Sequence, residues 1–388
     1  MRISLITSTF LPNFVGGREK HVYGLAKSLV KMGYDVYIIT GDRVKEAVQE
    51  KFSGITVYRL PYIKELRLSG ANEIIPYRIV SPLSFFSILN HINPDIIHAH
   101  DIKHFTSDMA AIYSCFSHKP FVLTIHGFYY KTSRFTRFLF QLHDSTFNLF
   151  TLKVAKKIIV VSKSLVKWPL TLFKTKIVYI PNAVEVDTYG DVPMENFRDK
   201  YGIPKDCHLV VSIGRITPQK GFDILIRAWK MARKEFPELQ AKLVIIGPVQ
   251  NYHYFKYLLK LAGDERDIIF TGRVPEADVA AALKAATVVV ISSRDEGLPT
   301  VLLEAISFGK PVVASSVGAI PKIIEDGKTG LLVKPEDPDG LAKALIRILV
   351  NDKLRGDVTD NVTKLRSHFS WDNMVKYIVR IYEEVLRR

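Results

Sequence analysis

Long apolar runs are missing from this 388-residue chain, and cysteine is nearly absent. No run reaches the roughly 18 to 20 apolar residues that a transmembrane helix needs, which excludes such a helix within this sequence. Cys115 and Cys207 are the only cysteines, so a disulfide framework is excluded and a reducing, cytoplasmic compartment is expected. The apolar stretch 3–9 is too short for a signal peptide and is better explained as a first strand.

Acidic residues are scarce in the first half of the chain. Residues 1–184 contain 24 lysines and arginines against 11 acids, whereas residues 185–388 contain 30 against 28. The segment 127–176 has ten cations, one acid (Asp144) and many aromatics. Such a segment can lie on an anionic membrane surface, bind an anionic substrate, or form an ordinary helix with its lysines in water. No nucleic-acid recognition motif accompanies it, so we predict a peripheral membrane contact and no nucleic-acid partner.

Paired metal ligands are also lacking. His98, His100 and His104 are clustered, but they have neither paired cysteines nor a helical His-x-x-x-His spacing beside them. Histidines at strand ends are more often packed or solvated than metal-bound, so no metal site is expected.

Apolar runs alternate with amphipathic stretches, which predicts an α/β fold of parallel sheets covered by helices. Strands are expected at 3–7, 35–40, 96–100, 122–125, 157–161, 209–213, 242–246, 268–270, 287–291, 311–314 and 331–333. Helices are expected at 21–32, within 134–154, and at 222–235, 278–285, 300–308, 341–350 and 370–388. Two doubly wound, Rossmann-like domains follow, over 1–181 and 182–365, with ligands bound between the carboxyl ends of their sheets.

The expected strand 287–291 runs through a polar loop into an expected helix. Pro299 is well suited to the first turn of that helix. The amides of Thr300 and Val301 would then be unpaired and would carry the positive end of the helix dipole. This helix start is therefore a candidate phosphate site.

Charged residues flank this helix start in the sequence. Glu304 lies about one turn into the helix, where its carboxylate could accept hydrogen bonds from a diol beside a bound phosphate. Glu296 precedes the helix and would face the other end of the same ligand. Arg215 and Lys220 follow another expected strand and together could clamp a diphosphate. The set suits a sugar nucleotide.

These segments resemble a known family. Gly-Arg-x-x-x-x-Lys-Gly at 214–221 and the glutamates with seven residues between them are similar to those of the retaining family-four glycosyltransferases, which have the GT-B fold. Further matches are 15–19, 95–100, 124–127, 161–163, 180–184, 309–314 and 329–333. Ala183 departs from the glycine usual at its position.

The resemblance implies two Rossmann-like domains facing across a cleft, the second holding a nucleotide diphosphate sugar and the first an acceptor. It also implies that a helix within 366–388 packs back on the first domain. The catalytic residues that it implies are His126, Glu296, Arg215 and Lys220. The donor-binding residues are Gly16, Gly17, Arg215, Lys220, Glu296, Gly297, Leu298, Thr300, Val301 and Glu304.

In the implied reaction a hexosyl group is transferred with retained configuration, and the leaving phosphate deprotonates the acceptor. UDP-sugars are the commoner donors, with GDP-mannose next, and the acceptor is a lipid-linked sugar or a growing glycan. No cofactor or metal is expected. A sugar-nucleotide epimerase and a non-catalytic sugar-nucleotide-binding protein are the alternatives. A nicotinamide enzyme is disfavoured because no Gly-x-Gly-x-x-Gly follows the first strand, where Gly16 and Gly17 stand.

Overall fold

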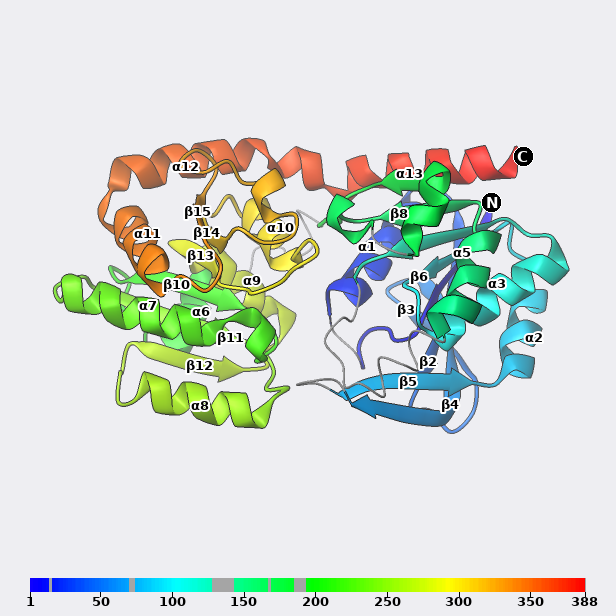
Figure 1. Cartoon of the computed structure of the whole chain (residues 1–388), viewed down its shortest axis with the longest axis horizontal. Helices are drawn as coiled ribbons and strands as arrows, with labels where there is room; N and C mark the ends of the chain where they lie inside the picture. Colours follow the sequence, from blue (N-terminus) through cyan, green and yellow to red (C-terminus); the bar gives the residue numbers. More distant parts are fainter. Residues whose placement is uncertain (14–15, 70–73, 128–142, 167–168, 185–192, 388) are drawn as a thin grey trace. The chain divides into compact units, whose positions relative to one another are not determined.

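The computed structural model describes residues 1–13, 16–69, 74–127, 143–166, 169–184 and 193–387 (Figure 1). The chain forms two compact units, each with a parallel sheet at its centre. The N-terminal unit comprises Met1–Ala183 and Trp371–Arg388, and the C-terminal unit comprises Val184–Ser370. The N-terminal unit therefore includes the end of the chain.

The sheet of the N-terminal unit has nine strands in the order β3-β4-β2-β1-β6-β7-β8-β9, with β5 paired to β4. All neighbours are parallel except β3–β4 and β4–β5, which are antiparallel. The strands are β1 (Arg2–Thr7), β2 (Asp35–Asp42), β3 (Val48–Phe52), β4 (Ile55–Ser69), β5 (Ile74–Val80), β6 (Ile96–His100), β7 (Phe121–Ile125), β8 (Lys157–Val160) and β9 (Ile177–Tyr179).

Helices cover both faces of this sheet, because the strands at its centre are apolar on both sides. The helices are α1 (Gly17–Lys31), α2 (Pro82–Ile92), α3 (Phe105–Ser117), α5 (Leu149–Val154) and α13 (Trp371–Leu386). One core layer joins the sheet to α1 and α13, with Leu25 and Tyr382 fully buried in it. The other joins the sheet to α2, α3 and α5, where Phe85 and Leu152 are fully buried.

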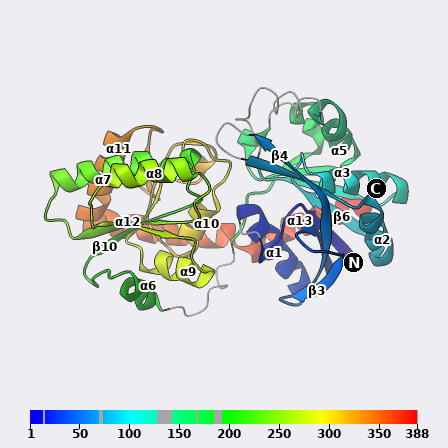
Figure 2. The ribbon, with the colours of Figure 1, turned by 90° about the horizontal axis from the view of Figure 1, so that it is seen from below.

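The sheet of the C-terminal unit is entirely parallel, in the order β12-β11-β10-β13-β14-β15. Its strands are β10 (His208–Ile213), β11 (Ala241–Ile246), β12 (Ile268–Gly272), β13 (Val288–Ile291), β14 (Val312–Ser315) and β15 (Leu331–Val333). Its helices are α6 (Met194–Lys200), α7 (Phe222–Glu235), α8 (Tyr252–Ala262), α9 (Glu276–Ala285), α10 (Thr300–Ser307), α11 (Pro338–Val350) and α12 (Asp352–Lys364). Figure 2 shows α7 and α8 on one face of this sheet and α6 and α9 on the other.

The strand order of this sheet brings two loops together. The chain passes from β10 to β11 on one side and returns to β13 on the other, so β10 and β13 are parallel neighbours. Their carboxyl ends therefore meet at the topological switch point, which is where open α/β sheets bind ligands. The loops at this point begin at Gly214 and Ser292.

The expected elements of the C-terminal unit are confirmed, including α7 at its expected bounds. In the N-terminal unit the five expected strands are present, but β3, β4, β5 and β9 were not anticipated. Helices α2 and α3 of the N-terminal unit were not predicted, nor were helices α6, α8 and α12 of the C-terminal unit. Most of the helical stretch expected within 134–154 lies outside the described residues; its described part contains α5.

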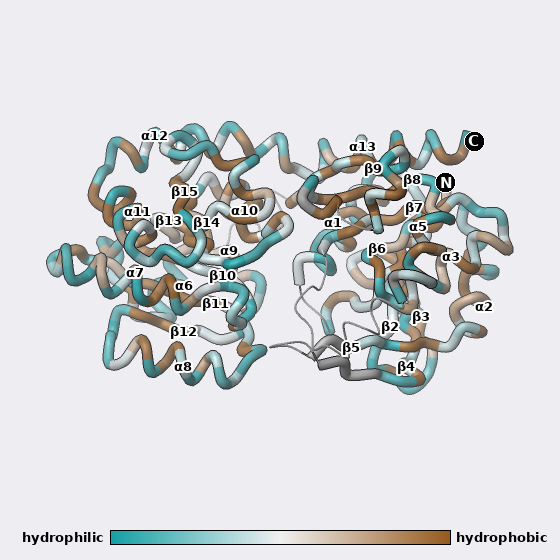
Figure 3. Tube along the Cα trace, in the orientation of Figure 1, coloured by the Kyte–Doolittle hydropathy of each residue, from teal (hydrophilic) through white to brown (hydrophobic). Residues whose placement is uncertain are grey.

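Helix α13 alternates between hydrophobic and hydrophilic residues along its length (Figure 3). Its apolar side packs on α1, where Gly24 faces the Trp371 ring. A Cβ at position 24 would lie 2.0 Å from Nε1 of Trp371, a distance that no real Cβ contact allows. The absence of a side chain at Gly24 is therefore what lets the end of the chain close over α1.

We predict that Gly24→Ala destabilises the N-terminal unit, because the added methyl must displace Trp371 or α13. The expected loss is about 1–3 kcal/mol, the usual range for overpacking. The matched control is Gly356→Ala on α12, where a Cβ meets nothing within 4 Å. That substitution should instead stabilise by up to about 1 kcal/mol, since alanine is the better helix former. Differential scanning calorimetry compares the two, and equal melting temperatures for Gly24→Ala and wild type would contradict the prediction.

Candidate functional site

The loops after β10 and β13 meet through a charged pair. Lys220 ends a short 3₁₀ helix after β10, and its Nζ lies 2.5 Å from Oε1 of Glu296. Ser293 donates a second hydrogen bond, of 2.7 Å, to the same carboxylate oxygen. The two charged side chains are 17 % and 9 % exposed, so the pair is held largely away from water. Two residues expected at the donor site are thus brought into direct contact.

Gly221 allows these loops to approach each other. Its φ is +63°, in the left-handed region, and a Cβ there would lie 2.1 Å from the carbonyl oxygen of Ser292. Ser292 Oγ also donates to the carbonyl of Lys220, at 3.0 Å. Only glycine combines this backbone conformation with this contact.

Arg294 fixes the second loop, and sequence reasoning missed it. Its guanidinium makes a bidentate pair with Asp223 at the start of α7, both distances being 2.8 Å, and also binds Glu336. A further hydrogen bond of 2.6 Å goes to the carbonyl of Pro218. The hydrogen bond with Asp223 raises the pKa of Arg294, so the pair stays ionised. Nothing in the sequence distinguishes Arg294 from a solvated loop cation.

Arg215 is the other expected cation of the site, and it is exposed. Its Nη1 donates to Oε1 of Gln250, at 2.9 Å, in the segment that follows β11. The loop carrying Arg215 is anchored by its neighbour, because the amide of Ile216 donates to the carbonyl of Pro248. The structure therefore places Arg215 at the same edge of the sheet as Lys220, turned toward Gln250.

The start of α10 corrects one expectation. Pro299 is the residue before the helix and not part of its first turn, because its ψ of 128° is extended. The helix begins at Thr300, so Thr300 and Val301 supply first-turn amides that have no acceptor within the helix. Leu298 and Val301 are buried, and so is Glu304, one turn further in. The carbonyl of Gly297 accepts the amide of Ala319.

The N-terminal unit contains the other expected site residues. Gly16 precedes α1 and Gly17 is its first residue. The helix start already holds a carboxylate, because Glu19 is buried and accepts hydrogen bonds from Arg18 (2.9 Å) and Thr9 (2.5 Å). Burial would raise the pKa of Glu19, but the Arg18 charge and these hydrogen bonds outweigh it and lower the pKa. Glu19 is thus the anion at this helix dipole.

His126 follows β7 and belongs to a cluster of four buried or partly buried histidines, with His21, His98 and His100. A fifth buried histidine, His104, is bound to Arg18. Burial lowers the pKa of every one, and the pKa values of His104 and His126 fall to about 3, with the Arg18 charge as the next cause. All five imidazoles are therefore neutral at neutral pH.

Three of these histidines raise the question of a metal. Ring nitrogens of His21, His100 and His126 all lie within 4.8 Å of one another. His100 Nδ1 and His126 Nε2 are 3.2 Å apart and share a hydrogen bond. Nitrogens around tetrahedral zinc stand about 3.4 Å apart, given Zn–N bonds of about 2.05 Å. The group is compact enough to approach such a site, but the Arg18 charge, which lowers the pKa values of His100 and His126, would oppose a further positive ion there.

One Asp-x-Asp sequence, Asp337-Pro338-Asp339, could have been a divalent-ion motif. The structure uses it to start α11, where Asp337 Oδ1 accepts the amide of Gly340 at 2.8 Å. It is a helix cap, and its carboxylate is already engaged.

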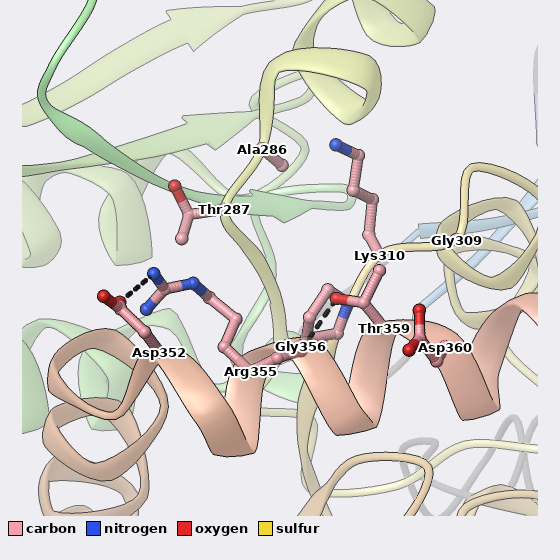
Figure 4. A pocket seen from close by; sticks show the side chains of 10 residues that line it. Ala286, Thr287, Gly309, Lys310, Asp352, Arg355, Gly356, Thr359 and Asp360 are labelled. Carbon is pink, nitrogen blue, oxygen red and sulfur yellow. Dashed lines mark hydrogen bonds and ion pairs between the residues drawn. The ribbon is translucent and has the colours of Figure 1, made fainter.

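A pocket of about 320 Å³ opens elsewhere on the C-terminal unit (Figure 4). Thr287 and Pro311, which line it, immediately precede β13 and β14, whereas Glu296 follows β13. The pocket therefore lies at the amino ends of the strands, opposite the Lys220–Glu296 pair. Its lysine, Lys310, has a pKa lowered by burial and by Arg198.

Comparison with known proteins agrees with this architecture. The family model described as glycosyl transferases group 1 matches residues 193–365, and the one described as glycosyltransferase family 4 matches residues 15–188. Together they cover most of both units, each with its own Rossmann-like sheet. The chain therefore belongs to the family-four, group 1 glycosyltransferases and has their GT-B fold.

Individual relatives match along the whole chain. An uncharacterized glycosyltransferase of Methanocaldococcus jannaschii is 31% identical over 99% of this chain and 98% of its own. A phosphatidyl-myo-inositol mannosyltransferase of Mycolicibacterium smegmatis is 27% identical, covering 95% of this chain and 90% of its own. Among solved structures, HepE of Anabaena in complex with UDP and glucose has a TM-score of 0.74 at 19% identity, covering 99% and 100% of the two chains.

The buried histidines predict an acid-sensitive N-terminal unit. Their folded-state pKa values are depressed, so as pH falls below about 6.5 the unfolded chain takes up protons before the folded one does, and stability drops. The expected slope is up to about 1.4 kcal/mol per pH unit for each histidine, continuing down to the folded-state values. The carboxylates with lowered pKa contribute only below about pH 4.5, so the window from pH 6.5 to 5 isolates the histidines.

Denaturant unfolding at several pH values in this window measures the slope. His21→Phe keeps a buried ring but removes one titrating group. It should therefore reduce the slope of unfolding free energy against pH by up to about 1.4 kcal/mol per pH unit. Exposed His253 offers the matched control, and His253→Asn should leave it unchanged. A free energy of unfolding that stays constant from pH 6.5 to 5 would contradict the prediction.

Proposed function

We propose that this protein is a retaining glycosyltransferase that transfers a hexosyl group from a nucleotide diphosphate sugar to an acceptor. The observation that carries the proposal is the Lys220–Glu296 pair at the switch point of the C-terminal sheet, directly before the first amides of α10. A cation and a helix start can bind a diphosphate, and a carboxylate beside them can accept hydrogen bonds from the attached sugar.

The cations and the glutamates of the proposed site have different roles. Arg215 and Lys220 stabilise the negative charge that grows on the departing diphosphate, the electrostatic effect that dominates many catalysed reactions. In the ligand-free protein Glu296 neutralises Lys220; the bound diphosphate competes for this ammonium and leaves the carboxylate to accept sugar hydroxyls. Glu304, buried one turn into α10, binds the ribose diol.

The amides at the start of α10 complete the proposed donor site. The amides of Leu298, Thr300 and Val301 hold the phosphates, and Gly297 leaves room beside them. Gly16 and Gly17 at the start of α1 let the backbone approach the donor. Both glycines are partly exposed and therefore reachable by a ligand.

His126 is proposed to contact the transferred sugar. Its neutral imidazole hydrogen-bonds to the sugar and does not serve as a charged acid. Retention follows if the leaving phosphate deprotonates the acceptor on the face from which it departs. We propose no metal, because two cations and a helix start already offset the charge of a diphosphate.

The identities of the donor and the acceptor are also proposed. UDP-sugars are favoured over GDP-mannose, and the acceptor is a lipid-linked sugar or a growing glycan. One relative is a phosphatidyl-myo-inositol mannosyltransferase by name, and one structural neighbour was solved with UDP-glucose. Both names support the class of ligand without fixing the base or the sugar.

Incubation with labelled nucleotide sugars tests the function against its alternatives. Donors are first ranked by thermal stabilisation, because a ligand that binds only the folded protein raises its apparent stability. Sugar transfer or slow donor hydrolysis that survives EDTA supports the proposal. An isomerised donor would mean an epimerase, and binding without turnover would mean a sugar-nucleotide-binding protein. Activity lost in EDTA and restored by magnesium or manganese would overturn metal independence.

The cations of the proposed site yield a sharp prediction. Arg215→Ala and Lys220→Ala should each lower kcat about a hundredfold or more, since loss of one transition-state donor costs about 2–4 kcal/mol. The matched control is Lys234→Ala, at an exposed lysine on α7. Turnover and folded fraction are measured together. Near-normal kcat in either site variant would remove that residue from the reaction.

We also propose that the segment 127–176 contacts an anionic membrane surface, which makes the enzyme peripheral at the cytoplasmic face. None of the described helices is long and apolar enough to cross a bilayer. Within the described part, Phe147, Phe150 and Leu172 expose 49 %, 37 % and 63 % of their surface. Helix α5 and the 3₁₀ helix containing Leu172 are in contact, so these apolar groups are carried by neighbouring elements.

Lysines lie near these apolar side chains in the sequence. Burial lowers the pKa of Lys176, and the charges of Lys156 and Lys153 lower it further. Lys176 also donates to the carbonyl of Lys153, at 2.6 Å. Lys153, Lys156 and Lys174 are exposed. The other expected contacts, Lys131, Arg134 and Arg137, lie outside the described residues.

Liposome sedimentation tests this contact. Each lysine near an anionic bilayer contributes about 1 kcal/mol, so Lys153→Glu, Lys156→Glu and Lys174→Glu combined should release the protein into the supernatant. Changing exposed Lys234, Lys322 and Lys353 to glutamate alters the net charge equally and should leave binding unchanged. Binding of wild type should weaken with salt. Equal recovery with anionic and neutral liposomes at low salt would contradict the membrane contact and favour a soluble acceptor.

A further inference from the structure

The chain leaves β6 in an unusual conformation. Asp101, the first residue after the strand, has φ +69°, and Lys103 has φ +64°. Residues with a side chain adopt this left-handed region at a cost, so other contacts must hold them there. Asp101 is also buried. Two such residues within three positions mark a turn that the surrounding structure imposes.

Contacts with β7 account for the conformation of Asp101. Its amide donates to the carbonyl of Thr124, at 2.7 Å, and its Oδ1 accepts the amide of His126, also at 2.7 Å. The residue therefore continues the ladder between β6 and β7 past the end of both strands. It does so with a carboxylate, and a charged acceptor gives a stronger bond than a carbonyl. The backbone that carries the His126 imidazole is anchored by Asp101.

Arg18 holds Asp101 from the opposite side. Its Nη1 lies 3.3 Å from Asp101 Oδ2 and 2.8 Å from His104 Nε2. Its Nη2 donates to Thr9 Oγ1, at 2.6 Å, and to Glu19 Oε1, at 2.9 Å. Since a guanidinium has no acceptor, His104 must accept through Nε2 and carry its proton on Nδ1. Arg18 thus connects the first turn of α1 to the segments that follow β1 and β6.

The His126 ring is confined from its other sides. His100 hydrogen-bonds to Nε2, and the ring of His21 lies edge-on at a centroid distance of 4.5 Å. These neighbours restrict rotation of the ring, whereas Asp101 restricts the main chain. The position of the imidazole therefore depends on both.

We propose that Asp101 and Arg18 are positioning residues for His126, Asp101 by fixing the main chain that carries the imidazole and Arg18 by fixing Asp101. This inference rests on the proposed function, in which His126 contacts the donor sugar. Neither residue need touch the substrate. A misplacement of about 1 Å can cost about a hundredfold in rate, so the anchor matters to turnover more than to binding.

Kinetics of Asp101 variants test the inference. Asp101→Ala should lower kcat about a hundredfold with donor KM within about threefold of wild type. Asp101→Asn keeps an acceptor for the His126 amide and should recover part of that loss. The matched control is Asp42→Ala: Asp42 is also buried, is the last residue of β2 in the same sheet and pairs with Arg59 at 2.7 Å. It should lose stability without losing kcat, measured where both variants are folded.

A readout other than activity completes the test. In NMR spectra the His126 amide proton should move upfield in Asp101→Ala and not in Asp42→Ala. In Arg18→Met the pKa of the His126 imidazole should rise, because the positive charge that lowers it is removed. The charges acting on this ring come from Arg18 and Glu19, and the Asn182 amide also lies beside it.

These experiments distinguish failure of the proposed function from failure of the positioning role of Asp101. Wild-type protein that transfers and hydrolyses no donor would overturn the proposed function, while the NMR shifts would still report the anchor. Active wild type with the same kcat in Asp101→Ala and Asp42→Ala would overturn the positioning role alone. An unchanged His126 amide shift in Asp101→Ala would overturn the anchor itself.

Discussion

The contact between Lys220 and Glu296 is the interaction on which the C-terminal site depends. Two opposite charges mostly removed from water are stable only when they stay paired and hydrogen-bonded, and Ser293 supplies the additional bond. The pair holds together the loops that follow β10 and β13, and Gly221 and Arg294 brace them at that separation. Removal of either charge would leave the other buried without a partner, so the site is ordered before any ligand arrives.

The polar centre of the N-terminal unit consists mainly of neutral histidine side chains and not of a charged pair. Its sheet ends in several buried histidines, and their protonation would place like charges side by side. Burial keeps them neutral by lowering their pKa values, and the Arg18 charge adds to this effect at His100, His104 and His126. His98 uses both ring nitrogens in hydrogen bonds, with Tyr382 and Thr124. Tyr382 belongs to α13, so the end of the chain contributes to the packing of this polar centre.

The alternation of apolar strands and amphipathic helices was enough to predict most of the C-terminal unit. Its strands are short, apolar on both faces and separated by helices of clear periodicity, as parallel sheets require. The antiparallel additions β3 and β5 escaped prediction because they alternate polar and apolar residues weakly and lie at the edge of the sheet. Helices α2 and α3 were missed because they are apolar around much of their circumference and show no clear period.

The sequence by itself was enough to propose which residues meet a donor, because the spacings between Arg215 and Lys220 and between Glu296 and Glu304 are short and can be recognised as a pattern. Only the tertiary structure decided how they are held. Arg294 becomes a brace through Asp223 and Glu336, which lie 71 and 42 positions away. Asp101 meets Arg18 and His126 because β6 lies beside both β1 and β7. Such contacts follow from strand order, and no short stretch of sequence records which strands will be neighbours.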